Sequence, residues 1–430
     1  MTAVARESVP ALLWRRWRNP AAWATAVDVF AGLLAVSLPW STSLVAIFAA
    51  ALLVSMAPFL DVRALLQSLK RPLCVLPMAL FALAVAGMLW SDAPWATRLY
   101  AVGPTAKLLM LPVLLYHFER SARGLQVFIA FLASCVLLTA MSWVVAFDPA
   151  LALKRGAEYG VPVKNYIDQS QEFALCAVVL AYPAITLLRE KRVWPAALLL
   201  AVSLSFIVNM AFVTVSRTAL VTMPVMLAVF ALLHLRWRHI VIVGCAAALF
   251  GALAWETSPK LRGTAATFLR DYELYQQHDT PTSIGLRLQF WQKSLKFFTE
   301  APLIGHGTGS TQGLFESAVT GPRNVSASSQ VIANPHNQTL NVAVQWGAIG
   351  VVLLYAMWLV HLMLFRGEGL AAWIGLMVVT QNIITALFNS HLSDFNEGWM
   401  YVLGVGIAGG MVLGARSRTA VPGAPTSAEP

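Results

Sequence analysis

The sequence predicts an all-α, polytopic integral membrane protein with about twelve transmembrane helices and one large polar loop that bears amphipathic helices. Two observations support this fold class. Hydrophobic residues make up 58% of the 430 residues and charged residues only 12%, whereas charged residues make up about 25% of a typical soluble domain. Apolar runs of the roughly 20 residues that cross a bilayer also follow one another along the chain, with one long polar interruption between residues 256 and 337.

The predicted spans occupy most of the chain. They cover residues 22–38, 41–60, 73–90, 98–117, 124–147, 172–188, 193–211, 216–234, 239–255, 338–364, 370–388 and 398–414. Residues 1–20 form a basic arm, and residues 21–414 form one transmembrane domain that includes the loop of residues 256–337. Residues 415–430 are rich in Pro, Ala, Ser and Thr, a composition typical of a disordered tail.

Lysine and arginine residues gather on one side of the predicted helices. Short loops on that side contain Lys70, Arg71, Arg189 and Arg366, whereas the short loops on the other side contain almost none. Because such charges resist translocation, we expect both termini to be cytoplasmic and the loop of residues 256–337 to be external. This bias also accounts for the net charge of +10. Nucleic-acid binding is not expected, because no basic stripe with interleaved aromatic residues is present.

Two helices are predicted within the long loop. The first covers residues 259–277 and the second covers residues 284–299. In the second, apolar residues recur at steps of four and three, which gives one apolar stripe: Ile284, Leu288, Trp291, Leu295 and Phe298. We expect this helix to lie flat on the membrane, with Arg287 near the depth of the lipid phosphates and with Lys293 and Lys296 pointing into water.

His336 is the first candidate for chemistry. It stands in the string PHNQTL, just before the apolar run of residues 338–364. The partial positive charge at the start of a helix disfavours a protonated imidazole, so we expect His336 to be neutral at pH 7 and able to accept a proton. The alternative is that His336 only caps the helix or anchors it at the membrane surface. Asn337, the next residue, is a possible supporting group.

Arg217 stands in SRTAL, at the external mouth of the span predicted for residues 216–234. A cation on this side is unexpected and therefore needs a reason. The planar guanidinium group of arginine can hold two phosphate oxygens at once, so a phosphorylated ligand is one explanation, and contact with lipid headgroups is the other. Lys154, Arg155 and Lys164, in the external segment before the sixth span, have the same two explanations.

Two further external motifs carry polar side chains. The turn PLIGHGTGS contains three glycines and His306, and it is more typical of a reversal between helices than of an anion-binding loop. Asp394 and His391 lie between the last two spans and bring a carboxylate near an imidazole. Asp394 can orient His336 or an acceptor hydroxyl, or it can simply be a solvated loop charge.

Two charged residues fall inside predicted spans. Lys107 and Asp28 each lie where an ion is costly unless it is paired, so we expect an ion pair between them, with a polar path as the alternative. On the external side, no cluster of Asp, Glu or His with the spacing of metal ligands is recognisable in the sequence. We therefore expect no metal and no other cofactor.

With these residues in place, the chain resembles the O-antigen ligase family and the related O-antigen polymerases. The ligases are membrane enzymes that join a glycan carried on a polyisoprenoid pyrophosphate to the lipid A core. The resemblance rests on the late external loop, on the strings SRTAL, RLQFW, PLIGHGTGS and PHNQTL, and on their order and common side of the membrane. The segment KNYIDQS is more similar to the ligases than to the polymerases.

The resemblance implies roles for particular residues. The functional histidine of the family corresponds to His336, its two functional arginines to Arg217 and Arg287, and a further acidic residue to Asp394. It also implies an undecaprenyl-pyrophosphate-linked glycan as donor, a lipid A-core hydroxyl as acceptor, and a metal-independent transfer on the periplasmic face of the bacterial inner membrane, as a step in lipopolysaccharide biosynthesis.

The residue types suit that reaction. A sugar hydroxyl that attacks an anomeric carbon needs a base, and arginines can neutralise the leaving pyrophosphate. In-line attack would invert the anomeric centre. A polymerase and a ligase with a protein acceptor remain alternatives, because only the acceptor differs. A transporter or flippase fits less well, because such proteins often carry their long connector in the middle of the chain and on the cytoplasmic side.

Overall fold

The computed structural model describes residues 19–419, apart from residue 157 and residues 320–321. The predicted basic arm lies almost entirely outside the described residues, and so does the predicted tail beyond residue 419. Within the described ranges the chain forms helices and connections without any strand, which confirms the all-α class. The tail was expected to begin at residue 415, but the last helix continues to Thr419.

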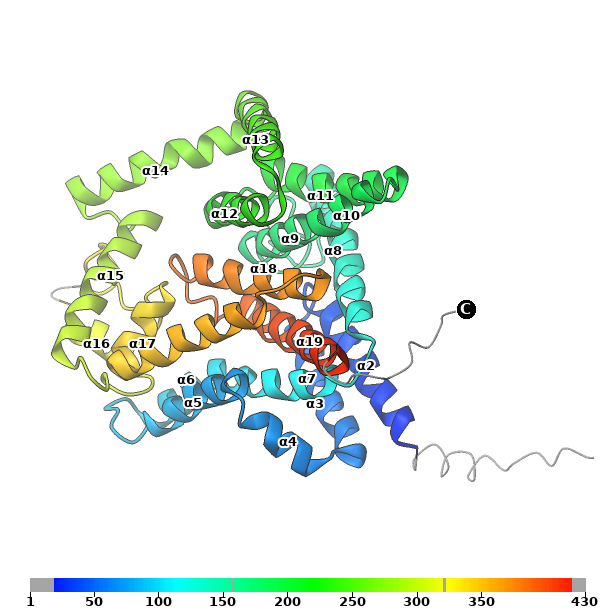
Figure 1. Cartoon of the computed structure of the whole chain (residues 1–430). Helices are drawn as coiled ribbons and strands as arrows, with labels where there is room; N and C mark the ends of the chain where they lie inside the picture. The colour runs from blue at the N-terminus through cyan, green and yellow to red at the C-terminus, as the bar shows by residue number, and fades with distance from the viewer. Residues whose placement is uncertain (1–18, 157, 320–321, 420–430) are drawn as a thin grey trace, which may run out of the picture.

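Figure 1 shows the course of the chain. The first part forms α2 (Pro20–Ser37), α3 (Thr42–Met56), η1 (Ala57–Phe59), α4 (Val62–Leu69), α5 (Pro72–Ala86), α6 (Trp95–Ala106), η2 (Lys107–Leu109), α7 (Met110–Phe118), α8 (Gly124–Phe147) and η3 (Pro149–Leu151). The second part forms α9 (Tyr166–Val179), α10 (Ala181–Arg189), α11 (Val193–Phe212), α12 (Arg217–His234), α13 (Trp237–Thr257), α14 (Pro259–His278), α15 (Ser283–Glu300), α16 (Thr311–Ser317), α17 (Gln338–Leu364), α18 (Leu370–Thr385) and α19 (Phe395–Thr419).

The described part of the chain contains ten helices, some of them bent, that are long and apolar enough to cross a bilayer. The predicted spans 73–90 and 370–388 form helices of only 15 and 16 residues, which are too short to cross alone. Counting α4 and α5, which meet at 80°, as one broken span gives eleven. Length and composition alone therefore do not confirm the predicted count of twelve, which requires the shorter apolar helix α18 as the twelfth span.

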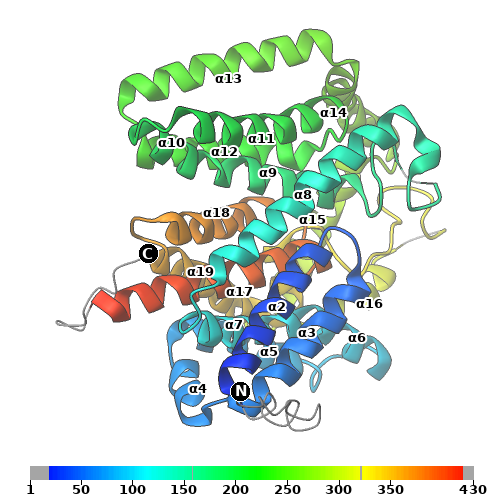
Figure 2. The ribbon, with the colours of Figure 1, turned by 90° about the vertical axis from the view of Figure 1, so that its right-hand side faces the viewer.

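Helix α19 forms the centre of the bundle, between α7 and α18 (Figure 1). In its most apolar segment 78% of the residues are buried, compared with 6% in α13. Small residues permit this close approach: a Cβ atom added to Gly410 would lie 2.7 Å from the backbone of Phe118 in α7. Helix α13 stands apart at the margin of the bundle (Figure 2), so its surface is left for lipid.

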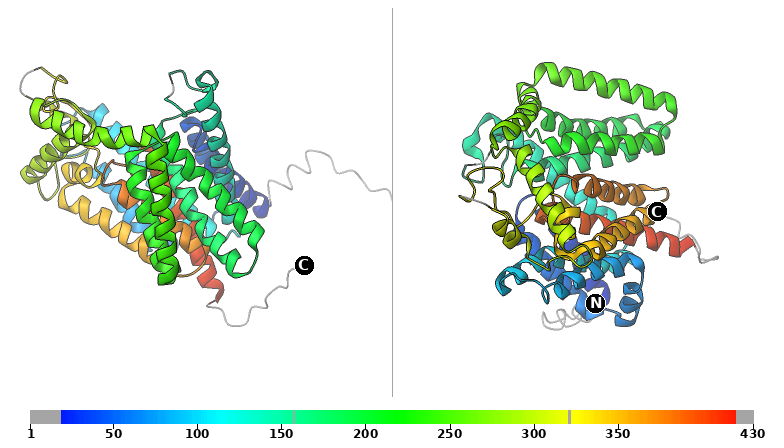
Figure 3. Two further views of the ribbon diagram at one scale, coloured as in Figure 1. Left: turned by 90° about the horizontal axis from the view of Figure 1, so that it is seen from above. Right: turned by 90° about the vertical axis from the view of Figure 1, so that its left-hand side faces the viewer.

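The polar segments gather at one end of the bundle, which we call the loop face. It consists of the connections of residues 148–165 and 386–394 and of the long segment of residues 258–337. Figure 3 shows the helices of the long segment together at this end. Both helices predicted there are confirmed, since α14 and α15 begin and end within about one residue of the predicted positions.

Helix α15 packs on protein with a side that differs from the predicted apolar stripe. Its buried side contains Phe290 and Phe297, which pack against α16 and α17. Of the predicted stripe, Leu295 is 56% exposed, whereas the other four residues are half-buried and Trp291 packs against the same cluster. The prediction that Lys293 points into water is wrong, because the Nζ atom of Lys293 donates to the carbonyl of Ser328 at 2.5 Å.

The predicted ion pair between Asp28 and Lys107 does not form. The carboxylate of Asp28 accepts a hydrogen bond from the hydroxyl of Ser121 at 2.7 Å and pairs with Nε2 of His117 at 2.7 Å. Lys107 instead donates to the carbonyl of Ser393 at 3.0 Å. Asp28 is thus held by the end of α7 and by the connection that follows it, and Lys107 is held by the connection between α18 and α19.

The glycine-rich turn of residues 302–310 is a reversal that packs on α17. The backbone N–H of Gly307 donates to the carbonyl of Gln345 at 2.9 Å, so this group is used within the protein and is not free for an anion. Helix α17 is interrupted at Gly347, which has φ 60° and ψ −158°. Essentially only glycine adopts this region of backbone space.

We expect Gly347→Ala to destabilise the protein. An added Cβ atom would lie 2.6 Å from the backbone nitrogen of Ile304 and closer still to the carbonyl of Leu303, and the backbone strain alone costs about 1–3 kcal/mol. Thermal unfolding in detergent should show a lower midpoint. Gly313→Ala is the matched control, because an added Cβ there meets nothing within 4 Å; equal midpoints for the two variants would contradict this account.

Candidate functional site

Two polar cavities meet at the loop face. The first has a volume of about 340 Å³ and we call it the histidine cavity; its walls include Lys164, Asp168, His336, Asn389, His391, Asp394 and Glu397. The second has a volume of about 310 Å³ and we call it the arginine cavity; its walls include Tyr166, Arg217, Lys260, Thr267 and Arg287. Ile167 lines both cavities, so they are neighbours. His336, Lys164, His391 and Asp394 line the first cavity, and Arg217 and Arg287 line the second, whereas Asn337, His306, Lys154 and Arg155 line neither.

His336 lies just before α17, with a positive φ of 53°. Its backbone N–H donates to Oδ1 of Asn334 at 3.0 Å, and its ring stacks on Phe290 at 6.2 Å between centroids. The surrounding protein and then the charge of Arg287 lower the pKa of His336, and a hydrogen bond with Asn389 partly opposes them. The ring is therefore neutral at pH 7, as expected, but desolvation and Arg287 are the causes rather than the start of the helix.

Asn389 links His336 to His391. Its Nδ2 atom lies 3.0 Å from Nε2 of His391, and an amide nitrogen can only donate, so Nε2 accepts and Nδ1 of His391 carries the proton. The amide oxygen of Asn389 can then accept from His336, which leaves the other ring nitrogen of His336 with a free lone pair. Burial lowers the pKa of His391 to about 3, so His391 is neutral as well.

Asn337 and Lys164 have structural partners. Asn337 caps α17, because its Oδ1 accepts from the N–H of Leu340 at 3.0 Å, and its Nδ2 donates to the carbonyl of Leu387 at 3.1 Å. The Nζ atom of Lys164 donates to Oδ1 of Asn396 at 2.6 Å. Burial lowers the pKa of Lys164, although nearby carboxylates oppose this. Asn337 thus holds the start of α17, and Lys164 braces one wall of the histidine cavity.

Arg217 begins α12 in the arginine cavity and is already paired. Its two terminal nitrogens each lie 3.1 Å from Oδ2 of Asp271, and one of them donates to the hydroxyl of Thr267 at 2.7 Å. Both partners belong to α14. A phosphate that binds here would therefore share Arg217 with a carboxylate.

Arg287 of α15 has no ion pair among the described residues. Its hydrogen bond to the hydroxyl of Ser283 is long, at 3.4 Å. Burial lowers the pKa of Arg287, Tyr166 opposes this effect and Arg217 adds to it, but an arginine stays charged in any case. Arg287 lines the arginine cavity, and its charge also acts on His336 in the neighbouring cavity. A charged guanidinium without a partner is well suited to hold an anion.

Sequence analysis missed the acidic wall of the histidine cavity. His391, Asp394 and Glu397 bring their ligand atoms within 4.8 Å of one another, so the expectation that the external side lacks such a cluster is wrong. The regular spacing of three residues between them can be read from the sequence. The cluster was not predicted because the last span was expected to begin at residue 398, whereas α19 begins at Phe395. These extra residues carry Glu397 to the cavity. By residue type the three side chains are able to hold a divalent cation.

Lys107 supports this wall from within the bundle. Its side chain is 8% exposed, and its Nζ atom donates to the backbone carbonyls of Ser393 and Asp394. Burial raises the pKa of the Asp394 carboxyl to about 6, and the ammonium of Lys107 limits this rise. Lys107 thus fixes the connection between α18 and α19 and balances part of its negative charge.

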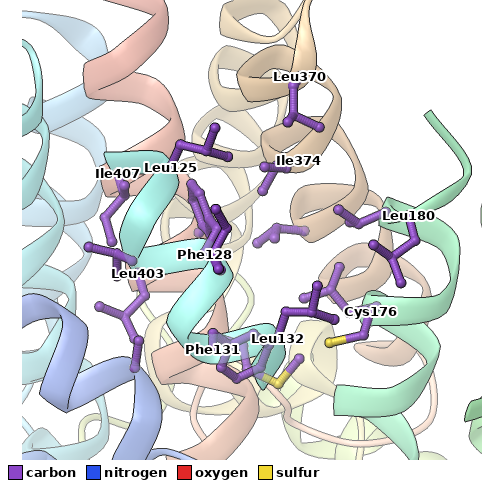
Figure 4. A pocket seen from close by; sticks show the side chains of 18 of the residues that line it. Leu125, Phe128, Phe131, Leu132, Cys176, Leu180, Leu370, Ile374, Leu403 and Ile407 are labelled. Carbon is purple, nitrogen blue, oxygen red and sulfur yellow. The ribbon is translucent and has the colours of Figure 1, made fainter. Parts of the chain in front are cut away.

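An apolar cavity of about 250 Å³ lies between α8, α9, α10, α18 and α19. Figure 4 shows Phe128 and other side chains of α8 on one side, with Ile374 of α18 and Leu403 of α19 around the same space. The lining extends from Met400, near the start of α19, to Leu370 at the opposite end of α18. We call it the apolar slot, because it leads from beneath the loop face deep into the bundle.

Comparison with protein families gives one match. Residues 200–355 match the family model described as O-antigen ligase. The matched range contains Arg217, Arg287 and His336, whereas Lys164 and the wall formed by residues 389–397 lie outside it. The comparison with curated proteins gives no match.

Lys107→Met is expected to loosen the connection between α18 and α19. The change leaves buried carbonyls and carboxylates without their cation and should cost about 2–5 kcal/mol of unfolding free energy. Hydrogen exchange of the peptide covering residues 386–397 should accelerate, and the unfolding midpoint in detergent should fall. Lys70→Met, at an exposed position, is the control. Unchanged exchange in the Lys107 variant would show that the ammonium does not hold the loop.

Proposed function

We propose that the chain is a membrane glycosyltransferase of the ligase type, because residues 200–355 match the family model described as O-antigen ligase. It transfers a glycan from undecaprenyl pyrophosphate to a lipid A-core hydroxyl on the periplasmic face of the bacterial inner membrane, without a metal and with inversion. One observation carries the proposal: the neutral ring of His336 and the guanidinium of Arg287, which has no ion pair among the described residues, line two adjoining cavities, and the charge of Arg287 acts on the ring. This orientation makes the loop face periplasmic and both termini cytoplasmic.

In this reaction His336 is the general base. The acceptor hydroxyl gives its proton to the ring nitrogen of His336 that is not bonded to Asn389. Its oxygen forms a bond to the anomeric carbon, and the bond from that carbon to the pyrophosphate breaks, so that its electron pair leaves with the pyrophosphate. A fixed tautomer favours this role, because the accepting nitrogen is then already free.

The arginine cavity holds the donor pyrophosphate. Arg287, which lacks an ion pair among the described residues, supplies the main charge, and Arg217 adds a guanidinium already oriented by Asp271. Lys260 lines the same cavity and is a further cation that sequence analysis missed. Charge placed in advance around the leaving group lowers the barrier without a metal.

The apolar slot explains how a lipid-linked substrate is accommodated. Its lining consists of apolar side chains from α2, α8, α9, α10, α11, α18 and α19, and each buried CH₂ group contributes about 0.8 kcal/mol. Part of a prenyl chain can lie there while the polar end of the substrate reaches the loop face.

The acceptor distinguishes a ligase of this type from a polymerase and from a protein ligase. A polymerase would extend the glycan on its lipid carrier, and a protein ligase would pass it to a protein. Lipopolysaccharide from a strain that lacks the protein tests the choice. A ligase leaves lipid-linked glycan of normal length, a polymerase leaves single units, and a protein ligase leaves lipopolysaccharide unchanged.

His336→Ala should abolish transfer. Loss of a general base costs about 10²–10⁴ in rate, and purified protein with donor and acceptor lipids measures it. In the wild type, kcat/KM should rise with pH and level off, with a midpoint below 6.5, the usual pKa of histidine, because the pKa of His336 is lowered. His239→Ala, at an exposed position on α13, is the control. Normal turnover by the His336 variant would refute the assignment.

Arg287→Ala should have two effects that Arg287→Lys separates. Both variants lose the bidentate fork and should bind the donor more weakly. Only the alanine variant removes the charge that lowers the pKa of His336, so only this variant should move the midpoint of the pH profile upward. The pH dependence of kcat/KM for the three proteins measures this. An identical midpoint in all of them would mean that Arg287 does not act on His336.

A further inference from the structure

His391 carries a buried donor without a partner. The side chain is 1% exposed, and its Nδ1 atom has no hydrogen-bond partner among the described residues. Nε2 accepts from Asn389, so Nδ1 bears the hydrogen. An unsatisfied buried polar group costs about 1–3 kcal/mol, which is a cost that a ligand can relieve.

Glu397 presents the complementary group. Its Oε1 atom is buried and has no hydrogen-bond partner in the part of the chain that the structure describes. It lies 3.9 Å from Nε2 of His391, and both side chains line the histidine cavity together with His336. The unpartnered oxygen of Glu397 therefore lies beside the imidazole that carries the unpartnered donor, in the wall next to the base.

We propose that His391 and Glu397 form the subsite that binds the acceptor sugar through its attacking hydroxyl. A hydroxyl is both a donor and an acceptor. Its oxygen accepts from Nδ1–H of His391, and its hydrogen first points to Oε1 of Glu397. The hydroxyl then turns and gives the proton to His336 as its oxygen forms the new glycosidic bond. This inference rests on the proposed function and assigns the acceptor to the histidine cavity, apart from the donor pyrophosphate in the arginine cavity.

A sugar hydroxyl fits this wall better than a metal ion. The ammonium of Lys107 donates to the carbonyl of Asp394 and lies against Gly398, one residue from Glu397. It already supplies positive charge to the carboxylates, and a divalent cation would be repelled by it. Arg287 is also close enough to act on the ring of His391. Two cations therefore oppose a third, whereas a neutral hydroxyl meets no such repulsion.

The test measures KM for donor and acceptor separately with the full-length protein in detergent. Glu397→Gln replaces one carboxylate oxygen by an amide, and His391→Leu removes the donor at similar size. Each should raise KM for a lipid A-core acceptor about 10–100-fold, the effect of one lost hydrogen bond to a charged or buried group, while KM for a polyprenyl-pyrophosphate glycan stays within about twofold. His391→Asn, which keeps an N–H near the position of Nδ1, should restore much of the acceptor affinity.

Three outcomes would overturn the subsite. Equal changes in KM for donor and acceptor would indicate general damage to the site. Weaker binding of the donor lipid and a lower unfolding midpoint would identify this case. If KM for the acceptor is as high in His391→Asn as in His391→Leu, the N–H of His391 does not bind the acceptor hydroxyl. Loss of wild-type transfer in EDTA, with recovery on adding a divalent ion, would make the cluster a metal site.

The design also separates this inference from the proposed function. If the wild type transfers no glycan to any acceptor, the proposed function fails. If transfer occurs and the acceptor KM is unchanged in the variants, only the subsite fails. His278→Leu and Glu300→Gln, at exposed positions of α14 and α15, are matched controls and should leave both KM values unchanged.

Discussion

The loop face depends on the hydrogen bonds that the ammonium group of Lys107 makes with the backbone. This ammonium lies within the bundle and donates to two carbonyls of the connection between α18 and α19. Backbone groups at this depth cannot rely on water and must find partners in the protein. The backbone N–H of Ser393 finds such a partner by donating to Oε1 of Gln338 at 3.2 Å. Together these bonds fold the connection back under the start of α17, and this fold sets Asn389 and His391 beside His336.

Hydropathy and helical period predicted most of the helices, because both are properties of neighbouring residues. They placed α14 and α15 almost to the residue, and they put Arg217, Arg287 and His336 at one end of the bundle. They could not predict the role of Asn389 or of Glu397, because both depend on a connection that folds back into the bundle. The wrong pairing of Asp28 with Lys107 has a related cause: a hydropathy profile gives the depth of a residue, but it does not say which helices are neighbours.

The two arginines differ because their surroundings differ. Arg217 stands at the first position of α12, where the partial positive charge of a helix start is unfavourable for a cation. Its ion pair with Asp271 offsets this and fixes the plane of the guanidinium. Arg287 stands within α15 and has no such carboxylate among the described residues, so its charge acts on both histidines of the neighbouring cavity. Arg217 is thus already oriented by a carboxylate, and Arg287 carries a charge that no carboxylate neutralises among the described residues.

This difference couples donor binding to base strength in the proposed reaction. While the arginine cavity lacks an anion, the charge of Arg287 lowers the pKa of His336 and keeps its ring neutral. A pyrophosphate bound to Arg287 would neutralise that charge, so the pKa of His336 would rise and its ring would become a better proton acceptor. The base would therefore strengthen only when the leaving group is in place. Because the two cavities adjoin at Ile167, the proposed nucleophile and leaving group would occupy separate cavities that are next to each other.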